Sequence, residues 1–277
     1  MDYHVEVKLS LIEKTRRDTL TCIFCGATPT TREHVFSEWT HALMGPREKL
    51  RAQQFLSFQH PDRTDFTDDL RFPGPLRDWQ IKCVCETKCN NGWMREIENA
   101  AIPVMTPLIG GQQTILSPAD QKFIATWAVL KVTVAHHNFI PPVKRKQFAS
   151  KREPQAEWSV WIGYCPGHEP SPAWDSRPFT LRKPKEPGGL GSPNCHASTL
   201  ILNQLLIHVV NIEKDFSLGW TFRGRGGSAL TGNIIPIWPP TNISVHWPPR
   251  PLTEQDVDVV SSSLYWAIQR VIARRRR

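Results

Sequence analysis

Residues 84–94 have the sequence VCETKCNNGWM. Cys85 and Cys89 are separated by three residues, and Cys89 leads directly into Asn90 and Asn91, a glycine and a tryptophan. Asparagine is a poor partner for an apolar core, and thiols beside such a polar run point to a bound metal ion. Buried or incidental thiols are the alternative, because cysteine also packs as a small hydrophobic side chain. The stretch thus predicts half of a metal site.

A second pair of cysteines, Cys22 and Cys25, stands near the start of the chain in the motif CxxCG. Two such pairs, brought together by the fold, supply the four thiolates of a tetrahedral zinc site. Cys83 competes with Cys85 for the third position. Close pairs within an odd total of seven cysteines favour metal ligands over disulfides in a reducing compartment.

Composition favours a folded protein that meets a polyanion. Of the 277 residues, 40% are hydrophobic and 22% are charged, which allows one large domain or two ordinary ones. The net charge of +8 is uneven: residues 1–116 hold 14 lysines and arginines against 15 acids, whereas residues 117–277 hold 20 against 11. Because the sequence has neither an apolar run of 18 residues nor a start typical of a signal peptide, we expect a cytoplasmic protein outside the membrane.

The first part of the chain contains alternating and helical patterns around the cysteine pairs. Residues 3–12 alternate and predict a strand, and IKCVC (81–85) predicts another. A helix is expected from Asn90 to about residue 105, because Trp93 and Ile97 share one helical face. The polar, proline-containing residues 44–78 are expected to be a loop or insertion.

The second part begins after IGGQQ (109–113), the most natural place for a domain boundary. Ser117 followed by proline and Asp120 predicts a helix start, and Thr253 with Asp256 predicts another. Between them lie tryptophan-rich strands such as WSVWIGYC, in which alternation places Trp158 in a core. We therefore expect two domains, 1–115 and 116–277, the second being basic and of α+β class.

Between the two cysteine pairs stands Glu33-His34. Histidine is suited to take a proton from water near neutral pH, and a carboxylate beside it contacts hard divalent cations through oxygen. Asn90 offers a neutral oxygen ligand, which leaves such a cation strongly Lewis-acidic toward a phosphate. Taken alone, Glu33-His34 indicates little, since surface and buried histidines are common.

The order of these motifs is more informative. The succession CxxCG, then EHV, then a cysteine pair running into CNNGW resembles the zinc-bearing HNH endonucleases of the ββα-metal fold. It is especially similar to bacterial and phage HNH-type proteins with EHVF and CNNGWM segments. The resemblance covers roughly residues 20–105 and implies an α+β protein whose N-terminal nuclease core is stapled by zinc.

The resemblance also implies roles for single residues. His34 would be the general base, and Glu33 and Asn90 would hold a catalytic cation, Mg²⁺ or Mn²⁺. Gln80 occupies the position of the family's medial asparagine, and Ser37 that of a proline. Four cysteines match the structural zinc ligands: Cys22, Cys25, Cys85 and Cys89.

A cluster of arginines ends the chain: Arg270, Arg274, Arg275, Arg276 and Arg277. Such a cluster binds phosphates without regard to sequence. The expected function is metal-dependent cleavage of nucleic acid, with double-stranded DNA favoured over RNA. A non-catalytic zinc-containing module that binds nucleic acid is the alternative, as is a nuclease effector activated by a partner that the second half senses.

Overall fold

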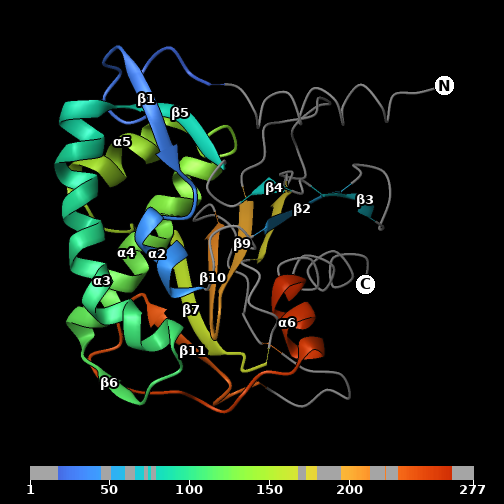
Figure 1. Cartoon of the computed structure of the whole chain (residues 1–277). Coiled ribbons are helices and arrows are strands. Elements are labelled where there is room, and N and C mark those ends of the chain that lie inside the picture. The colour runs from blue at the N-terminus through green and yellow to red at the C-terminus, as the bar shows by residue number, and fades with distance from the viewer. Residues whose placement is uncertain are drawn as a thin grey trace.

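The protein is of mixed α+β class, as the sequence predicted (Figure 1). The computed structural model describes residues 18–44, 51–59, 66–71, 74–75, 79–167, 173–179, 195–212, 222 and 230–263. The strand predicted over residues 3–12 and the arginines from Arg270 to Arg277 lie outside these ranges. No helix within them is long and apolar enough to cross a membrane.

The first part of the chain forms a two-stranded antiparallel sheet followed by helices. Strand β1 (Thr30–His34) pairs with β5 (Gln80–Cys85), which confirms the predicted strand at IKCVC. The short helix α2 (Glu38–Leu43) follows β1. After β5 come the wide helical segment η2 (Glu86–Met94), which contains a kink at Gly92, and the long helix α3 (Arg95–Ile109).

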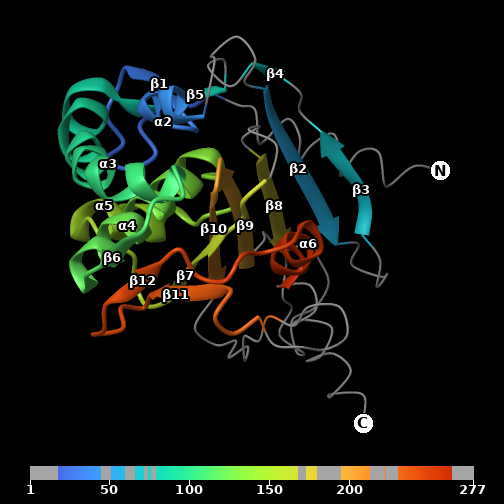
Figure 2. The same ribbon diagram turned by 60° about the horizontal axis from the view of Figure 1, so that its bottom comes forward.

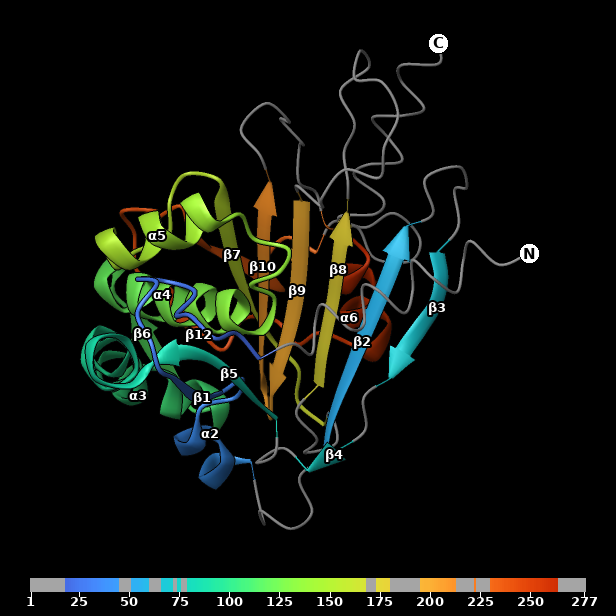
Figure 3. The ribbon, with the colours of Figure 1, turned by 90° about the horizontal axis from the view of Figure 1, so that it is seen from above.

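The large sheet has eight strands, seven of them in the order β11-β7-β10-β9-β8-β2-β3 (Figure 3). These are β2 (Arg51–Gln59), β3 (Phe66–Arg71), β7 (Trp158–Tyr164), β8 (Ala173–Phe179), β9 (Cys195–Leu202), β10 (Leu205–Ile212) and β11 (Ile234–Trp238). The short β4 (Gly74–Pro75) pairs with β2. Neighbouring strands are antiparallel except β2 and β8, which run parallel.

The expectation of a loop over residues 44–78 was wrong, because β2 and β3 lie within it. The polar composition of this segment masked the strands. Strand β2 obtains one of its partners, β8, from more than a hundred residues further along the chain. Pairing over such a distance leaves no mark on local polarity, which explains the error.

Helix α4 (Pro118–Ala135) is the central element of the fold (Figure 2). It begins as predicted, with a capping box in which Ser117 and Asp120 exchange hydrogen bonds. Every residue from Ile124 to Ala135 is buried, so no side of this stretch faces solvent. A helix that is buried all round lies inside a protein, and α4 packs between α3 and the large sheet.

The two faces of the large sheet bury different side chains. On β7, Trp158 belongs to the cluster that includes α4, as the alternation predicted, and Trp161 belongs to the cluster on the other face. Helix α6 (Glu254–Ser261) covers that second face and begins with the predicted capping box of Thr253 and Asp256. The remaining elements are α5 (Pro142–Lys151) and the paired strands β6 (Thr114–Leu116) and β12 (Val245–Trp247).

Segments on both sides of residue 115 share the core. One cluster of buried side chains extends from Cys22 through α3 and α4 to Trp247. The large sheet likewise takes β2 and β3 from before residue 115 and its other long strands from after it. The division into domains 1–115 and 116–277 stays a sequence prediction, and the packing between the two segments brings α4 to the candidate site.

Candidate metal centre and histidine site

The cysteine pairs lie beside the paired strands β1 and β5. Cys22 and Cys25 stand in a tight turn before β1, in which Gly26 donates its N–H to the carbonyl of Cys22 at 2.9 Å. Gly26 has φ +77°, a conformation that a side chain would strain. Cys85 ends β5 opposite Thr30, and Cys89 follows in η2, so the pairing of the strands brings both cysteine pairs to one end.

The four sulfur atoms gather at one point, all within 4.8 Å of one another. Cys22 Sγ lies 3.7 Å from Cys89 Sγ, and Cys25 Sγ lies 3.4 Å from Cys85 Sγ and 3.6 Å from Cys89 Sγ. A tetrahedral zinc ion with Zn–S bonds of about 2.3 Å spaces its sulfurs by about 3.8 Å, whereas a disulfide needs about 2.05 Å. The cluster therefore fits a metal ion such as zinc.

The individual thiols of the four-cysteine cluster differ in how readily they lose a proton. Although burial opposes the thiolate form of Cys22, backbone hydrogen bonds from Cys25, Cys85 and Phe24 lower its pKa to about 7. Burial raises the pKa of both Cys85 and Cys89. These two thiols become thiolates only with a strong positive charge at hand, so metal binding at this cluster releases protons.

Cys83, the competitor for Cys85, is a core residue. Its side chain is fully buried, and burial raises its pKa. Among the described residues, the group of metal-binding side chains that the fold brings together consists of the two predicted pairs without Cys83.

His34 is the last residue of β1, and its register partner on β5 is Gln80. The side chains of this pair meet, with Gln80 Nε2 at 2.7 Å from His34 Nε2. His41 of α2 stands on another side of the imidazole, with the two rings nearly perpendicular and their centroids 5.9 Å apart. A half-buried imidazole is thus held between a strand and a short helix.

Glu33 belongs to a buried ionic cluster. Its Oε1 accepts a hydrogen bond from Lys131 Nζ at 2.5 Å, and Glu98 Oε1 is 2.5 Å from the same nitrogen. Lys131 also donates to the backbone carbonyl of His34 at 3.2 Å. Lys131 is completely buried, so its ammonium group finds all three acceptors inside the protein.

Protonation in this cluster follows from the opposing charges. Burial by itself lowers the pKa of Lys131, but the carboxylates of Glu33 and Glu98 more than reverse that effect and raise it above its usual value. Burial by itself raises the pKa of Glu98, but Lys131, the Ser37 hydroxyl and nearby His34 lower it below its usual range. Lys131 and Glu98 therefore stay charged at neutral pH.

Ser37 connects this cluster to α4 a second time. Its hydroxyl donates to Glu98 Oε1 at 2.5 Å and accepts from Trp127 Nε1 at 3.1 Å. Ser37 is therefore a hydrogen-bonding link between α3 and α4.

Sequence reasoning missed the partners of Glu33. Lys131 carried one usable signal, since it is the only charged residue in the apolar run ATWAVLKVTVA (125–135). A lysine in such a helix indicates a buried charge with an acidic partner. Glu98 is a possible further cation ligand by sequence, but Glu96 and Glu98 together are typical of a solvated helical face. Ser37 carried no signal, because a serine before a helix is common on surfaces.

Asn90 is half-buried in η2, directly after the metal-binding Cys89. The start of the observed helix differs from the predicted one, because Gly92 has φ −95° and ψ −120° and puts a kink in η2. The long helix that carries Glu98 therefore begins after the kink rather than at Asn90.

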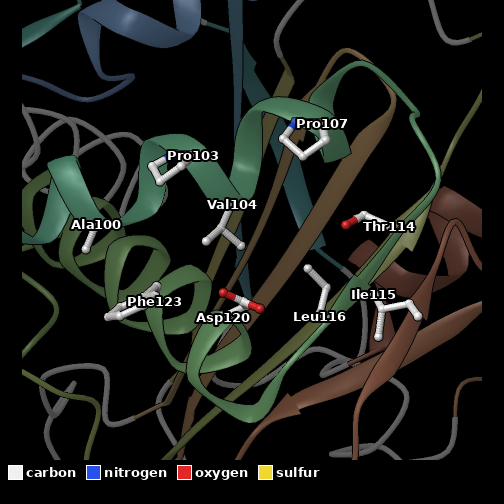
Figure 4. A pocket seen from close by; sticks show the side chains of 9 residues that line it. All are labelled: Ala100, Pro103, Val104, Pro107, Thr114, Ile115, Leu116, Asp120 and Phe123. Atoms are coloured by element: carbon white, nitrogen blue, oxygen red, sulfur yellow. The ribbon is translucent and has the colours of Figure 1, made fainter.

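An open groove of about 490 Å³ lies at the other end of α3 from β1 and β5 (Figures 1 and 4). Helix α3, β6 and the first turns of α4 form its walls. Its lining is mostly apolar, with Pro103, Pro107, Ile115 and Phe123, and Asp120 belongs to the α4 capping box. The groove holds none of the residues predicted for chemistry.

In comparisons with protein-family models, with curated proteins and with solved structures, nothing matches this chain.

Proposed function

We propose that the protein is a metal-dependent endonuclease of the ββα-metal type that hydrolyses phosphodiester bonds, with DNA as the favoured substrate. The main support is the contact between His34 and Gln80 at one end of the β1–β5 pair, together with the four-cysteine cluster at the other end. The order of elements adds to it. A cysteine pair and β1 come first, α2 and β2 to β4 intervene, and β5, the second cysteine pair and α3 follow, which is similar to the order in the family the sequence resembles apart from the intervening elements.

His34 would take the proton from the attacking water. In the structure the Gln80 Nε2–H group donates to His34 Nε2, and a half-turn of the terminal amide would bring its oxygen there instead. With the oxygen toward His34, Nε2 carries the imidazole proton and donates it to the amide, and Nδ1 keeps its lone pair for the water. Gln80 thus serves as a positioning residue that selects the basic tautomer.

Glu33 and Asn90 would hold a divalent cation through hard oxygen atoms, as Mg²⁺ or Mn²⁺ prefers. When bound, this cation supplies Lewis acidity toward the phosphate and its leaving oxygen. The four cysteines would hold zinc, whose part is to join two polar loops rather than to take part in the reaction.

The test is cleavage of a supercoiled plasmid with Mg²⁺ or Mn²⁺ by the wild type and by His34→Ala. Loss of the general base should reduce the cleavage rate by about 10²–10⁴-fold. His246→Ala is the matched control, because His246 is an exposed histidine on β12. This variant should cleave the plasmid at the wild-type rate. Equal rates for the wild type and His34→Ala would refute the proposed role of His34.

One observation favours the non-catalytic alternative. Glu33 is engaged by Lys131, as in a purely structural ion pair. A zinc-containing module that only binds nucleic acid would bind DNA and would not cleave it with any divalent cation. Its His34→Ala variant would bind DNA with unchanged affinity.

A further inference from the structure

Lys131 places a permanent positive charge where a catalytic cation would be needed. Its Nζ lies 2.5 Å from both Glu33 Oε1 and Glu98 Oε1 and 3.2 Å from the carbonyl of His34. Three oxygen atoms around one buried cation form a ligand set of the kind that hard metal ions use. The ammonium group and a metal ion therefore compete for the same carboxylates.

Exposure is graded across this cluster. The side chain of Lys131 is 0% exposed, that of Glu33 10% and that of Glu98 23%. Lys131 cannot touch a substrate, whereas the side chains of Glu33 and Glu98 both keep some exposure to solvent. An approaching cation therefore meets the carboxylates first, with the ammonium behind them.

The charges do not balance inside the cluster. Two carboxylates face one ammonium group, which leaves a net charge of −1 in a largely buried place. Buried charge without compensation is costly, so the cluster favours one further cation. Within the described residues, every hydrogen bond to Glu33 and Glu98 goes to Oε1, so Oε2 of each is available as a ligand atom.

Resting on the proposed function, we propose that Lys131 is a positioning residue and internal counter-cation of the catalytic cation site, and that Glu98 is the second carboxylate of that site. By occupying Oε1 of both glutamates, Lys131 leaves one oxygen of each for the metal ion. By cancelling one negative charge, it weakens cation binding and keeps the bound cation more electrophilic.

This role predicts an effect opposite to that of a structural lysine. If Lys131 only supported the fold, its removal would loosen the site and weaken cation binding. If it balances charge, Lys131→Met leaves two uncompensated carboxylates, and the site should bind a divalent cation more tightly.

The measurement is Mn²⁺ binding to the zinc-loaded full chain, followed by the electron paramagnetic resonance signal of free Mn²⁺. We expect Lys131→Met to lower the Kd for Mn²⁺ by at least about tenfold and Glu98→Gln to raise it by about tenfold, from the gain or loss of a unit charge near the ion. The double variant restores the net charge of −1 and should return to the wild-type Kd. Lys122→Met is the control, because Lys122 lies on the same helix as Lys131 and forms an exposed ion pair with Glu153.

A Kd in Lys131→Met equal to or higher than that of the wild type would overturn the inference. Should Lys131→Met fail to fold, Glu98→Gln decides, since it leaves a neutral Glu33–Lys131 pair; an unchanged Kd there would remove Glu98 from the site. The proposed function fails separately, when the wild type and His34→Ala cleave DNA alike. The shifts in Mn²⁺ affinity would still support an internal lysine cation in that case, and absence of Mn²⁺ binding in all variants would exclude it.

Discussion

The cysteine cluster and the Glu33–Lys131–Glu98 cluster both include residues of the two-stranded sheet β1–β5, but they are assembled in different ways. The cysteines arrive as two close pairs, each in a turn beside β1 or β5. The ionic cluster takes one residue each from β1, α3 and α4. A site built from local pairs shows itself in the sequence, and a site built from single residues depends on the packing of whole helices.

The largest effect is expected from breaking the cysteine cluster. Structural zinc contributes about 10–16 kcal/mol in small zinc-binding peptides, as much as the whole stability of an ordinary domain. Cys89→Ala should therefore lose its zinc and unfold the segment around β1 and β5, as elemental analysis and limited proteolysis would show.

The matched control is Cys83→Ala, since Cys83 is a buried cysteine of the same sheet that lies outside the cluster. It should keep one zinc ion per chain. Equal zinc content in Cys89→Ala and the wild type would show that the cluster is not a zinc site.

Breaking the ionic cluster should cost less. Lys131→Met leaves two largely buried carboxylates without a cation, and removal of one partner of a buried ion pair costs about 3–5 kcal/mol. Lys122→Met, which removes an ion pair whose side chains are 48% and 37% exposed, should cost at most about 1 kcal/mol. Urea unfolding of metal-chelated and metal-loaded protein measures both, and equal losses for the two variants would show that burial does not set the worth of Lys131.

The smallest effect concerns buried histidines whose charged form is disfavoured by burial. His136 and His196 are buried with ring centroids 4.7 Å apart. Burial lowers the pKa of His196 to about 3 and that of His136 well below its usual value, and the charges that act on His136 belong to His196 and His137. Burial disfavours the charged form of both side chains, so they are neutral in the folded protein.

A lowered histidine pKa gives the pH dependence a definite sign. Below pH about 6.5, His136 and His196 each bind a proton in the unfolded chain but not in the folded chain. The free energy of unfolding therefore falls as the pH falls, by about 1.4 kcal/mol per pH unit for each of these protons. His196→Phe removes one such site. The free energy of unfolding of this variant should decline less steeply between pH 6 and pH 4.5, by the slope that about one bound proton contributes. A slope identical to that of the wild type would contradict the buried neutral state of His196.

Much of the four-cysteine cluster and the helix starts could be predicted from the sequence, because their signals are local. Cysteine spacing, a glycine in the turn after Cys25, and the capping boxes at Ser117 and Thr253 each act within a few residues. The choice between Cys83 and Cys85 needed the structure, since it depends on which thiol the core covers. Neither the Lys131 partner of Glu33 nor the strand β2 could be predicted. Glu33 and Lys131 are about a hundred residues apart in the chain, and β2 and β8 are more than a hundred apart.

The parallel pairing of β2 with β8 sets the order in which the protein can form during synthesis. Residues 51–59 leave the ribosome long before residues 173–179, and parallel pairing over such a separation is slow to nucleate. Until β8 arrives, β2 is an open edge that other chains can pair with. The nascent chain therefore passes through a long stage in which its cysteine pairs can take up metal while its main sheet is unfinished.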